Sequence, residues 1–184
     1  ESAPERPRFL QEKRGLTGAE RGTAMHLVMQ FLPLDTPAEL DAVAEVIDGL
    51  RQRRLLTAEQ AAALDIPALV RFLASPLARR IRTAPQVWRE YRFALLTDAA
   101  IYDKAAAGEE MLLQGVADCV FATESGLTVV DFKTDRVTAD EVPQRAEVYR
   151  LQLDAYAGAL SRILERPVTE RILYFFACDE EIYL

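Results

Sequence analysis

Two stretches decide the fold of this chain: Gln114-Gly115-Val116-Ala117-Asp118-Cys119-Val120-Phe121 and, shortly after it, Thr128-Val129-Val130-Asp131-Phe132-Lys133-Thr134-Asp135. Each is an apolar, β-branched run of the kind found in buried strands, and each carries a carboxylate. Gly126 between them is typical of a turn, so the runs predict an antiparallel hairpin. Side chains two residues apart in a strand share a face, so Asp131 and Lys133 are expected side by side. In such a hairpin Asp118 of the first run can lie close to Asp131 of the second.

Two carboxylates and one ammonium on an apolar sheet require an explanation, because an unpaired buried charge is very costly. Asp118 and Asp131 repel each other when they are close. A divalent cation such as Mg²⁺ or Mn²⁺, which prefers oxygen ligands, relieves that repulsion. The alternative is that Lys133 forms an ordinary salt bridge with one aspartate on a half-exposed hairpin. Spacing alone leaves both interpretations open.

Composition indicates one soluble globular domain. The 184 residues are 50% hydrophobic and 28% charged, a balance that predicts a packed core rather than disorder. No apolar run reaches the length of a membrane span, and no signal peptide is recognised at the N-terminus. Cys119 and Cys178 lack the spacing of a metal site, so no iron–sulfur cluster is expected. The glycine-rich lysine loop of ATPases is also missing from the sequence, so no ATP site is expected in it.

The net charge of −7 argues against DNA binding through bulk electrostatics. It is compatible with an enzyme that meets nucleic acid in a local groove, because an acidic metal centre itself adds negative charge. Basic residues are most concentrated between residues 51 and 82, where arginines fall in predicted helices. These arginines either form solvated helical faces or contact phosphates.

The N-terminal part of the chain is expected to be helical. Residues 1–16 are interpreted as a linker in a protein cut from a longer chain, and residues 17–84 as a helical lobe. Helix-start signals occur at Thr17, Thr36, Thr57, Ile66 and Ser75. The signals at Thr17 and Thr36 are capping boxes, and the one at Thr36 has proline at the first helical position.

The first predicted helix carries His26, the only histidine in the sequence. A lone helical histidine is most often a hydrogen-bonded core or surface residue. Neutral imidazole is also a good third ligand for a transition ion and an acceptable one for Mn²⁺. Because two carboxylates elsewhere favour a cation, His26 is a candidate ligand.

Residues 85–184 are expected to form the α/β core. Val87–Leu96 alternates with period two and is expected to be a strand with Glu90 on the same face as Arg92. Glu90 is a further metal ligand, a residue that supports the ligands, or half of a surface ion pair. After the hairpin we expect a long helix from near Pro143 to near Leu164, then a buried strand at residues 168–177. Residues 181–184 form an edge strand or an unstructured end.

The long helix carries a polar group within its apolar stripe. Gln152 lies between Tyr149 and Tyr156 at helical spacing. Gln152 can order a water or a phosphate, and the tyrosines can bond phosphates or stack on bases. Alternatively, the tyrosines pack against the sheet with their hydroxyls at the surface.

Together these residues resemble the RecB-type nucleases of the PD-(D/E)XK superfamily. The resemblance rests on order and spacing across most of the chain, in the segments Arg21-Gly22-Thr23-x-x-His26, Glu90, Gly115-Val116-Ala117-Asp118, Asp131-Phe132-Lys133-Thr134-Asp135 and Tyr149-x-x-Gln152-Leu153-x-x-Tyr156. It implies an α/β fold with a restriction-endonuclease-like core, in which helices flank a mixed β-sheet, and an N-terminal helical lobe that carries the histidine.

The resemblance also implies a function. Such proteins are Mg²⁺- or Mn²⁺-dependent deoxyribonucleases, and the AddA-type members act as exonucleases beside a helicase motor that delivers single-stranded DNA from broken ends for recombinational repair. The implied partners are DNA, the helicase domain of the full-length chain and an AddB-type second subunit, in the bacterial cytoplasm. AddB-type nuclease domains carry an iron–sulfur cluster, whose cysteines this sequence lacks, so the AddA-type assignment is favoured.

By this resemblance the metal ligands are His26, Asp118, Asp131 and the backbone carbonyl of Phe132, and Lys133 acts on the attacking water. The implied catalytic group also includes Gln152, and residues assigned to the substrate or to support of the site are Glu90, Tyr149, Tyr156, Arg21 and Thr23. Two rival functions are a nuclease fold that has become a structural or DNA-guiding module and a hydrolase of small phosphoesters on the same scaffold.

Overall fold

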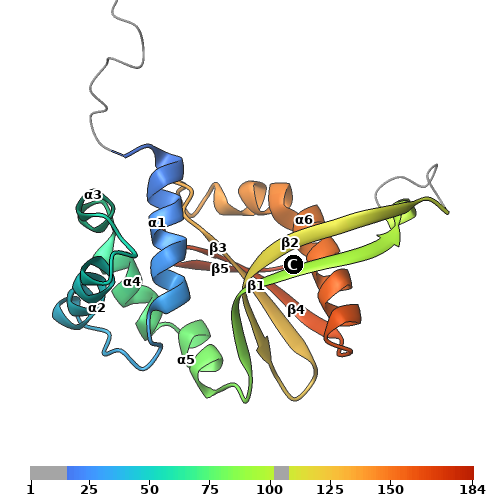
Figure 1. The fold of residues 1–184 in the computed structure, drawn as a ribbon, viewed down its shortest axis with the longest axis horizontal. Coiled ribbons are helices and arrows are strands. Elements are labelled where there is room, and N and C mark those ends of the chain that lie inside the picture. Colours follow the sequence, from blue (N-terminus) through green and yellow to red (C-terminus); the bar gives the residue numbers. More distant parts are fainter. Residues whose placement is uncertain (1–15, 102–107) are drawn as a thin grey trace, which may run out of the picture.

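The computed structural model describes residues 16–101 and 108–184 and shows a helical lobe followed by a mixed α/β core (Figure 1). The expected N-terminal linker and the middle of the expected loop between Asp98 and Glu110 lie outside the described residues. The elements, in order, are α1 (Gly18–Phe31), α2 (Leu40–Gln52), α3 (Ala58–Ala62), α4 (Ile66–Ala74), α5 (Pro76–Thr83), β1 (Val87–Asp98), η2 (Ala99–Ile101), β2 (Glu110–Ala122), β3 (Leu127–Lys133), α6 (Val142–Ile163), β4 (Val168–Phe175) and β5 (Glu180–Tyr183). None of the described helices has the length and apolar character needed to cross a membrane.

Side-chain caps start four of the lobe helices where the sequence predicts them. Thr17 and Thr57 form capping boxes, and Asp65 and Ser75 accept hydrogen bonds from the first turns of α4 and α5. The predicted capping box at Thr36 is wrong: α2 begins at Leu40, without a side-chain cap. Instead, the backbone before α2 forms two turns. In one the Thr36 amide donates a hydrogen bond to the Pro33 carbonyl, and in the other the Glu39 amide donates to the Pro37 carbonyl.

The sheet has the strand order β1-β2-β3-β4-β5. The pair β3–β4 is parallel and the other neighbours are antiparallel, so the sheet is mixed as expected. The long helix α6 supplies the crossover that a parallel pair requires. β4 lies between two strands with a buried run, and β5 forms the edge strand that was one of the two alternatives for the last residues.

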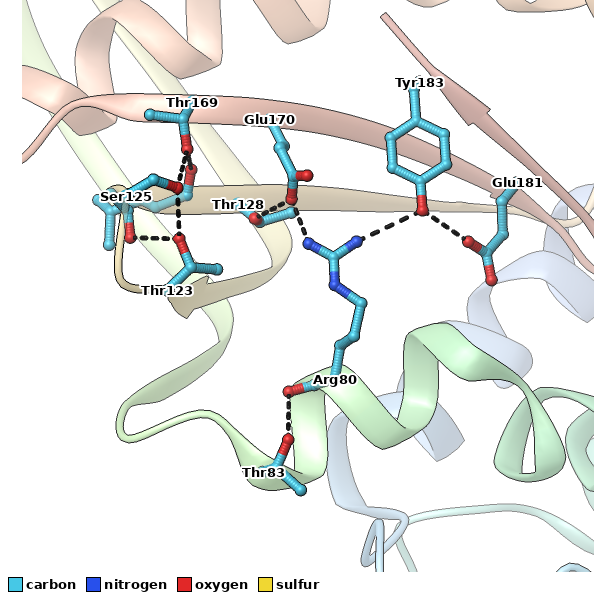
Figure 2. Close-up of polar contacts among 11 residues, drawn as sticks. Arg80, Thr83, Thr123, Ser125, Thr128, Thr169, Glu170, Glu181 and Tyr183 are labelled. Carbon is cyan, nitrogen blue, oxygen red and sulfur yellow. Dashed lines mark hydrogen bonds and ion pairs between the residues drawn. The ribbon is translucent and has the colours of Figure 1, made fainter.

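The predicted turn between β2 and β3 depends on Gly126. Its φ of 153° disfavours L side chains, and a Cβ there would lie 2.4 Å from the carbonyl oxygen of Pro167. Hydroxyls also connect this end of the hairpin to β4: Ser125 Oγ lies 3.2 Å from Thr123 Oγ1 and 3.4 Å from Thr169 Oγ1 (Figure 2). The turn is therefore fixed against the neighbouring strand.

Two apolar layers cover the two faces of the sheet. One face, formed by alternate residues such as Phe121 and Phe132, packs against the helical lobe in a cluster centred on Phe72. The opposite face packs against α6 through residues such as Leu153 and Leu160 (Figure 1). This alternation has the period of two that strands impose, and it places Asp131 and Lys133 toward the α6 side.

Arg80 on α5 connects the helical lobe to the sheet (Figure 2). Its guanidinium forms an ion pair with Glu170 on β4, and its Nη1 lies 3.3 Å from Tyr183 Oη on β5. Glu170 also accepts a 2.7 Å hydrogen bond from the fully buried Thr128 on β3. The guanidinium lies 5.5 Å from the centroid of the Phe121 ring on β2, so this one side chain ties α5 to several strands.

Candidate active site

Three carboxylates form a row across β1, β2 and β3. In the β1–β2 ladder the neighbouring pairs place Glu90 opposite Asp118. In the β2–β3 ladder Cys119 pairs with Val130, so the next position along each strand places Asp118 opposite Asp131. The hairpin thus brings together the two aspartates, as expected from the sequence, and β1 adds a third acid.

His26 approaches this row from α1. Its Nδ1 lies 3.3 Å from Asp118 Oδ1, and one ligand atom each from His26, Glu90 and Asp118 lie within 4.8 Å of one another. Nitrogen and oxygen ligands lie about 2.0–2.6 Å from a divalent ion. These three side chains are therefore close enough to share one ion after small adjustments.

Hydrogen bonds keep Asp118 ionised despite its burial. Burial acts to raise the pKa of Asp118, but the contact with His26 and the 2.7 Å hydrogen bond from the Phe132 amide outweigh it and lower that pKa. The hydrogen bond with Asp118 in turn raises the pKa of His26, although burial opposes this. An ionised carboxylate is the form that binds a metal.

Glu90 adopts an unusual backbone conformation. Its φ is 50°, in the left-handed region that residues other than glycine seldom occupy. Partial burial and the charge of Asp118 raise the pKa of the Glu90 carboxyl. Strained, partly desolvated acids of this kind concentrate at functional sites.

Asp131 has the most strongly raised pKa of the three acids in the row. Burial, and then the nearby charge of Asp118, raise the pKa of Asp131 to about 7. Lys133 forms an ion pair with its Oδ2, yet this buried oxygen accepts no contact with full hydrogen-bond geometry from a described residue. A buried acceptor in this state is costly, and a bound cation would satisfy it.

Lys133 lies between Asp131 and an aromatic ring. Its Nζ is 3.7 Å from the centroid of the Tyr149 ring, which is a close cation–π contact. Side-chain exposure of Lys133 is only 13%. The ammonium is therefore held on one side by a carboxylate of the row and on the other by helix α6.

The Tyr149 ring is itself fixed by a polar cluster. The Tyr149 hydroxyl lies 3.0 Å from Asp135 Oδ2 and accepts a 3.0 Å hydrogen bond from Arg145 Nη2. Arg145 also donates a 2.9 Å hydrogen bond to Asp135. Asp135 and Arg145 thus hold the ring over Lys133.

Gly115 explains the position of Tyr156 further along α6. A Cβ at Gly115 would lie 2.6 Å from the Tyr156 ring, so only glycine leaves room for it on β2. The ring also packs edge-to-face on Phe93, and its hydroxyl lies 3.3 Å from Gln152 Nε2. Tyr149 and Tyr156 therefore pack at two points of the sheet, with the exposed Gln152 between them.

A groove, called the metal-binding groove below, exposes the candidate metal ligands to solvent. Its volume is about 410 Å³, and its walls include His26, Glu90 and Asp118. Thr23 also lines it and donates a 3.0 Å hydrogen bond to the carbonyl of Ala19 in its own helix. Arg21 does not line this groove but faces a neighbouring cavity.

The donor set fits a hard divalent cation. Imidazole and carboxylates are ligands that Mn²⁺ accepts, and the carboxylates suit Mg²⁺ as well. The burial of Asp131 and its repulsion by the nearby charge of Asp118 both favour such an ion. Cys119 is fully buried, with its pKa raised to about 12, so it takes no part.

Three features of this site have no signal in the sequence. The cation–π contact of Tyr149 with Lys133 depends on how α6 packs on β3, which no local pattern encodes. Arg145, which fixes the Tyr149 ring, is one of several helical arginines and nothing local distinguishes it. The sequence is compatible with three roles for Glu90, and a period-two strand gives no sign of its left-handed backbone.

Comparison with known proteins agrees with this geometry. The family described as PD-(D/E)XK nuclease superfamily matches residues 5–182. The chain is 42% identical over 181 residues to an ATP-dependent helicase/nuclease subunit of Bacillus cereus and 41% identical to the corresponding protein of Bacillus thuringiensis subsp. konkukian.

In both comparisons the match covers 93% of this chain and 14% of the relative. The chain therefore corresponds to a small part of these proteins. The match across nearly its whole length, together with the mixed sheet and the row of acids, shows that the chain belongs to the PD-(D/E)XK nuclease superfamily.

Proposed function

We propose that this chain is a Mg²⁺- or Mn²⁺-dependent DNA exonuclease domain. The observation that carries the proposal is the row Glu90–Asp118–Asp131 with His26 at one end and Lys133 at the other. Membership of a nuclease superfamily supports phosphodiester hydrolysis, and this row supplies the charges which that reaction needs.

His26, Asp118 and Asp131 would hold the cation, with Glu90 and the Phe132 carbonyl as further ligands. Held there, a divalent ion would supply Lewis-acid polarisation of the scissile phosphate and a water of lowered pKa. The hydrogen bond from the Phe132 amide orients Asp118 for this task.

Lys133 acts on the water and the phosphate. Its ammonium orients the attacking water and offsets the negative charge that develops on the phosphate oxygens in the transition state. The ion pair with Asp131 and the ring of Tyr149 restrict the ammonium to one place beside the acids. A fixed charge stabilises a transition state better than a mobile one.

Residues of α6 would complete the site. Gln152 is exposed beside the Tyr156 hydroxyl, where its amide can hold a water or a phosphate oxygen of the DNA backbone. Tyr149 is committed to Lys133 and Asp135, so we assign it to positioning rather than to base stacking.

The similarity to helicase/nuclease subunits favours the view that this domain is part of a larger helicase–nuclease complex. We infer that a helicase motor in the full-length chain delivers single-stranded DNA to the nuclease and that an AddB-type subunit is the partner, in the bacterial cytoplasm. Processing of double-strand breaks for recombinational repair follows from that arrangement. The size of the relatives, of which this chain spans 14%, supports a longer parent protein.

Cleavage of end-labelled single-stranded DNA in Mg²⁺ or Mn²⁺ tests the proposal. We expect mononucleotides or short fragments with the unsubstituted chain, none in EDTA, and none with Lys133→Ala, whose folding is checked by circular dichroism. Arg79→Ala is a matched control, because Arg79 is an exposed cation on α5 that lines neither the metal-binding groove nor the cavity beside it.

Internal fragments from a circular substrate would replace the exonuclease assignment with an endonuclease one. Equal cleavage by the Lys133→Ala variant would refute the site. Metal binding without any DNA cleavage would favour the structural or DNA-guiding module, and hydrolysis of a small chromogenic phosphodiester alone would favour the phosphoesterase.

A further inference from the structure

We propose that a cavity beside the metal-binding groove binds one nucleotide of the DNA strand adjacent to the phosphate that is cleaved. We name this cavity the arginine pocket. It is lined by Gly18, Arg21, Gly22, Met25, Ala63, Leu64, Asp65, Thr134, Asp135, Arg136, Phe176 and Ala177. The inference rests on the proposed nuclease function and names the path of the substrate.

The arginine pocket lies directly beside the metal-binding groove. Gly18, Gly22 and Thr134 line both cavities. Helix α1 passes so close to the end of β3 here that a Cβ at Gly22 would lie 2.9 Å from Thr134 Oγ1. Gly22 permits this close contact, and the two cavities lie on either side of it, so a strand bound at the acids would pass over the contact to reach the pocket.

The charged side chains of the pocket leave two cations available. Asp65 accepts a hydrogen bond at the start of α4, and Asp135 is paired with Arg145. The side chains of Arg21 and Arg136 make no hydrogen bond or ion pair with any residue in the described part of the chain. Guanidinium groups are the protein's strongest phosphate ligands.

The rest of the lining is apolar. Met25 and Phe176 are buried, and Leu64 is partly buried beside them. Apolar and aromatic surface receives nucleobases without regard to their sequence. The cavity volume of about 460 Å³ lies within the range of roughly 300–1,000 Å³ seen for small-molecule sites.

The two guanidinium groups and the apolar lining of the arginine pocket together fit a nucleotide. Phosphates next to the scissile one would lie on Arg21 and Arg136, and the base would enter the apolar part between α1 and the end of β4. The location explains how a chain with a net charge of −7 can hold a polyanion: it offers these two cations directly beside the acids that bind the metal.

The salt dependence of DNA binding tests this assignment. Anisotropy of a labelled thymidylate dodecamer is measured in Ca²⁺, with the oligonucleotide verified intact on a gel, over a range of KCl concentrations. Each phosphate contact to single-stranded DNA contributes about 0.7 to the slope of log Kd against log salt. We expect Arg21→Gln and Arg136→Gln each to lower that slope by about 0.7 and to weaken binding several-fold.

Arg79→Gln is the matched control, since it removes the same charge from an exposed site outside the pocket. Its slope should equal that of the unsubstituted chain. Equal slopes for all three variants, or no salt-dependent binding by the unsubstituted chain, would overturn the arginine pocket. Metal-dependent cleavage by the unsubstituted chain is scored separately, so the nuclease function can stand while the pocket fails.

Discussion

Replacing Asp131 with asparagine should stabilise the metal-free protein and at the same time abolish its activity. The carboxyl is buried beside Asp118, and its pKa rises from 3.8 to about 7. At 1.4 kcal/mol for each pH unit this corresponds to ~4 kcal/mol of destabilisation of the folded state once the carboxyl is ionised. An amide has no such charge. We expect Asp131→Asn to recover about half, ~2 kcal/mol, because it leaves Lys133 without its ion pair.

The pH dependence has a definite sign. A pKa that is higher in the folded than in the unfolded state makes the native protein lose stability as the pH rises toward and through about 7. Urea denaturation of the metal-free chain should therefore show the variant and the unsubstituted chain converging in acid, separating as the pH rises from about 4 to about 7, and keeping a constant difference above that.

Metal reverses the order of stability. Mn²⁺ should stabilise the unsubstituted chain by mass action and the Asp131→Asn variant much less, and the variant should not cleave DNA. If asparagine destabilises the metal-free chain at every pH, Asp131 is an ordinary partner of Lys133 and its buried charge carries no net penalty.

Substitutions at three further positions test the packing around the site and the connection between the helical lobe and the sheet. Tyr149→Leu removes the cation–π contact, worth about 1–2 kcal/mol for a desolvated pair, and should lower kcat up to tenfold, while Tyr149→Phe keeps the ring and should retain most activity; equal losses would show that the hydroxyl, not the ring, positions Lys133. Gly115→Ala forces a methyl against the Tyr156 ring and should destabilise the fold by about 1–3 kcal/mol in urea denaturation, and an unchanged transition would contradict that packing. Arg80→Ala, which removes a partly exposed ion pair between α5 and the sheet, should lower stability by about 1–2 kcal/mol without changing Mn²⁺ affinity, and a change in that affinity would contradict a purely structural role.

The central hairpin is predictable because its signals are local. Two β-branched runs around Gly126 specify an antiparallel pair, and the period of two then fixes which side chains share a face. That is why the sequence alone places Asp131 and Lys133 together. The mixed sheet follows from the resemblance, and α6 and β4 from their apolar patterns.

The capping box predicted at Thr36 does not form, because the backbone there adopts turns. The residue pattern of a capping box is present, but prolines on both sides of it draw the backbone into turns, and α2 begins only at Leu40. A capping motif specifies which atoms can bond, not whether the backbone there is free to become helical.

Long-range packing explains the remainder of the site. The position of Glu90 depends on a left-handed residue inside a strand, which no alternation pattern predicts. The contact between Tyr149 and Lys133 depends on the docking of α6, and the arginine pocket depends on the approach of α1 to the end of β3. Such features arise where separate elements meet.

Calorimetric titration with Mn²⁺ tests the central claim most directly, because every proposed role depends on a cation held by His26 and the row of acids. We expect one saturable site in the unsubstituted chain, lost in Asp118→Asn and weakened in both His26→Ala and Glu90→Gln. Undiminished binding in Asp118→Asn would place the metal elsewhere and contradict the account.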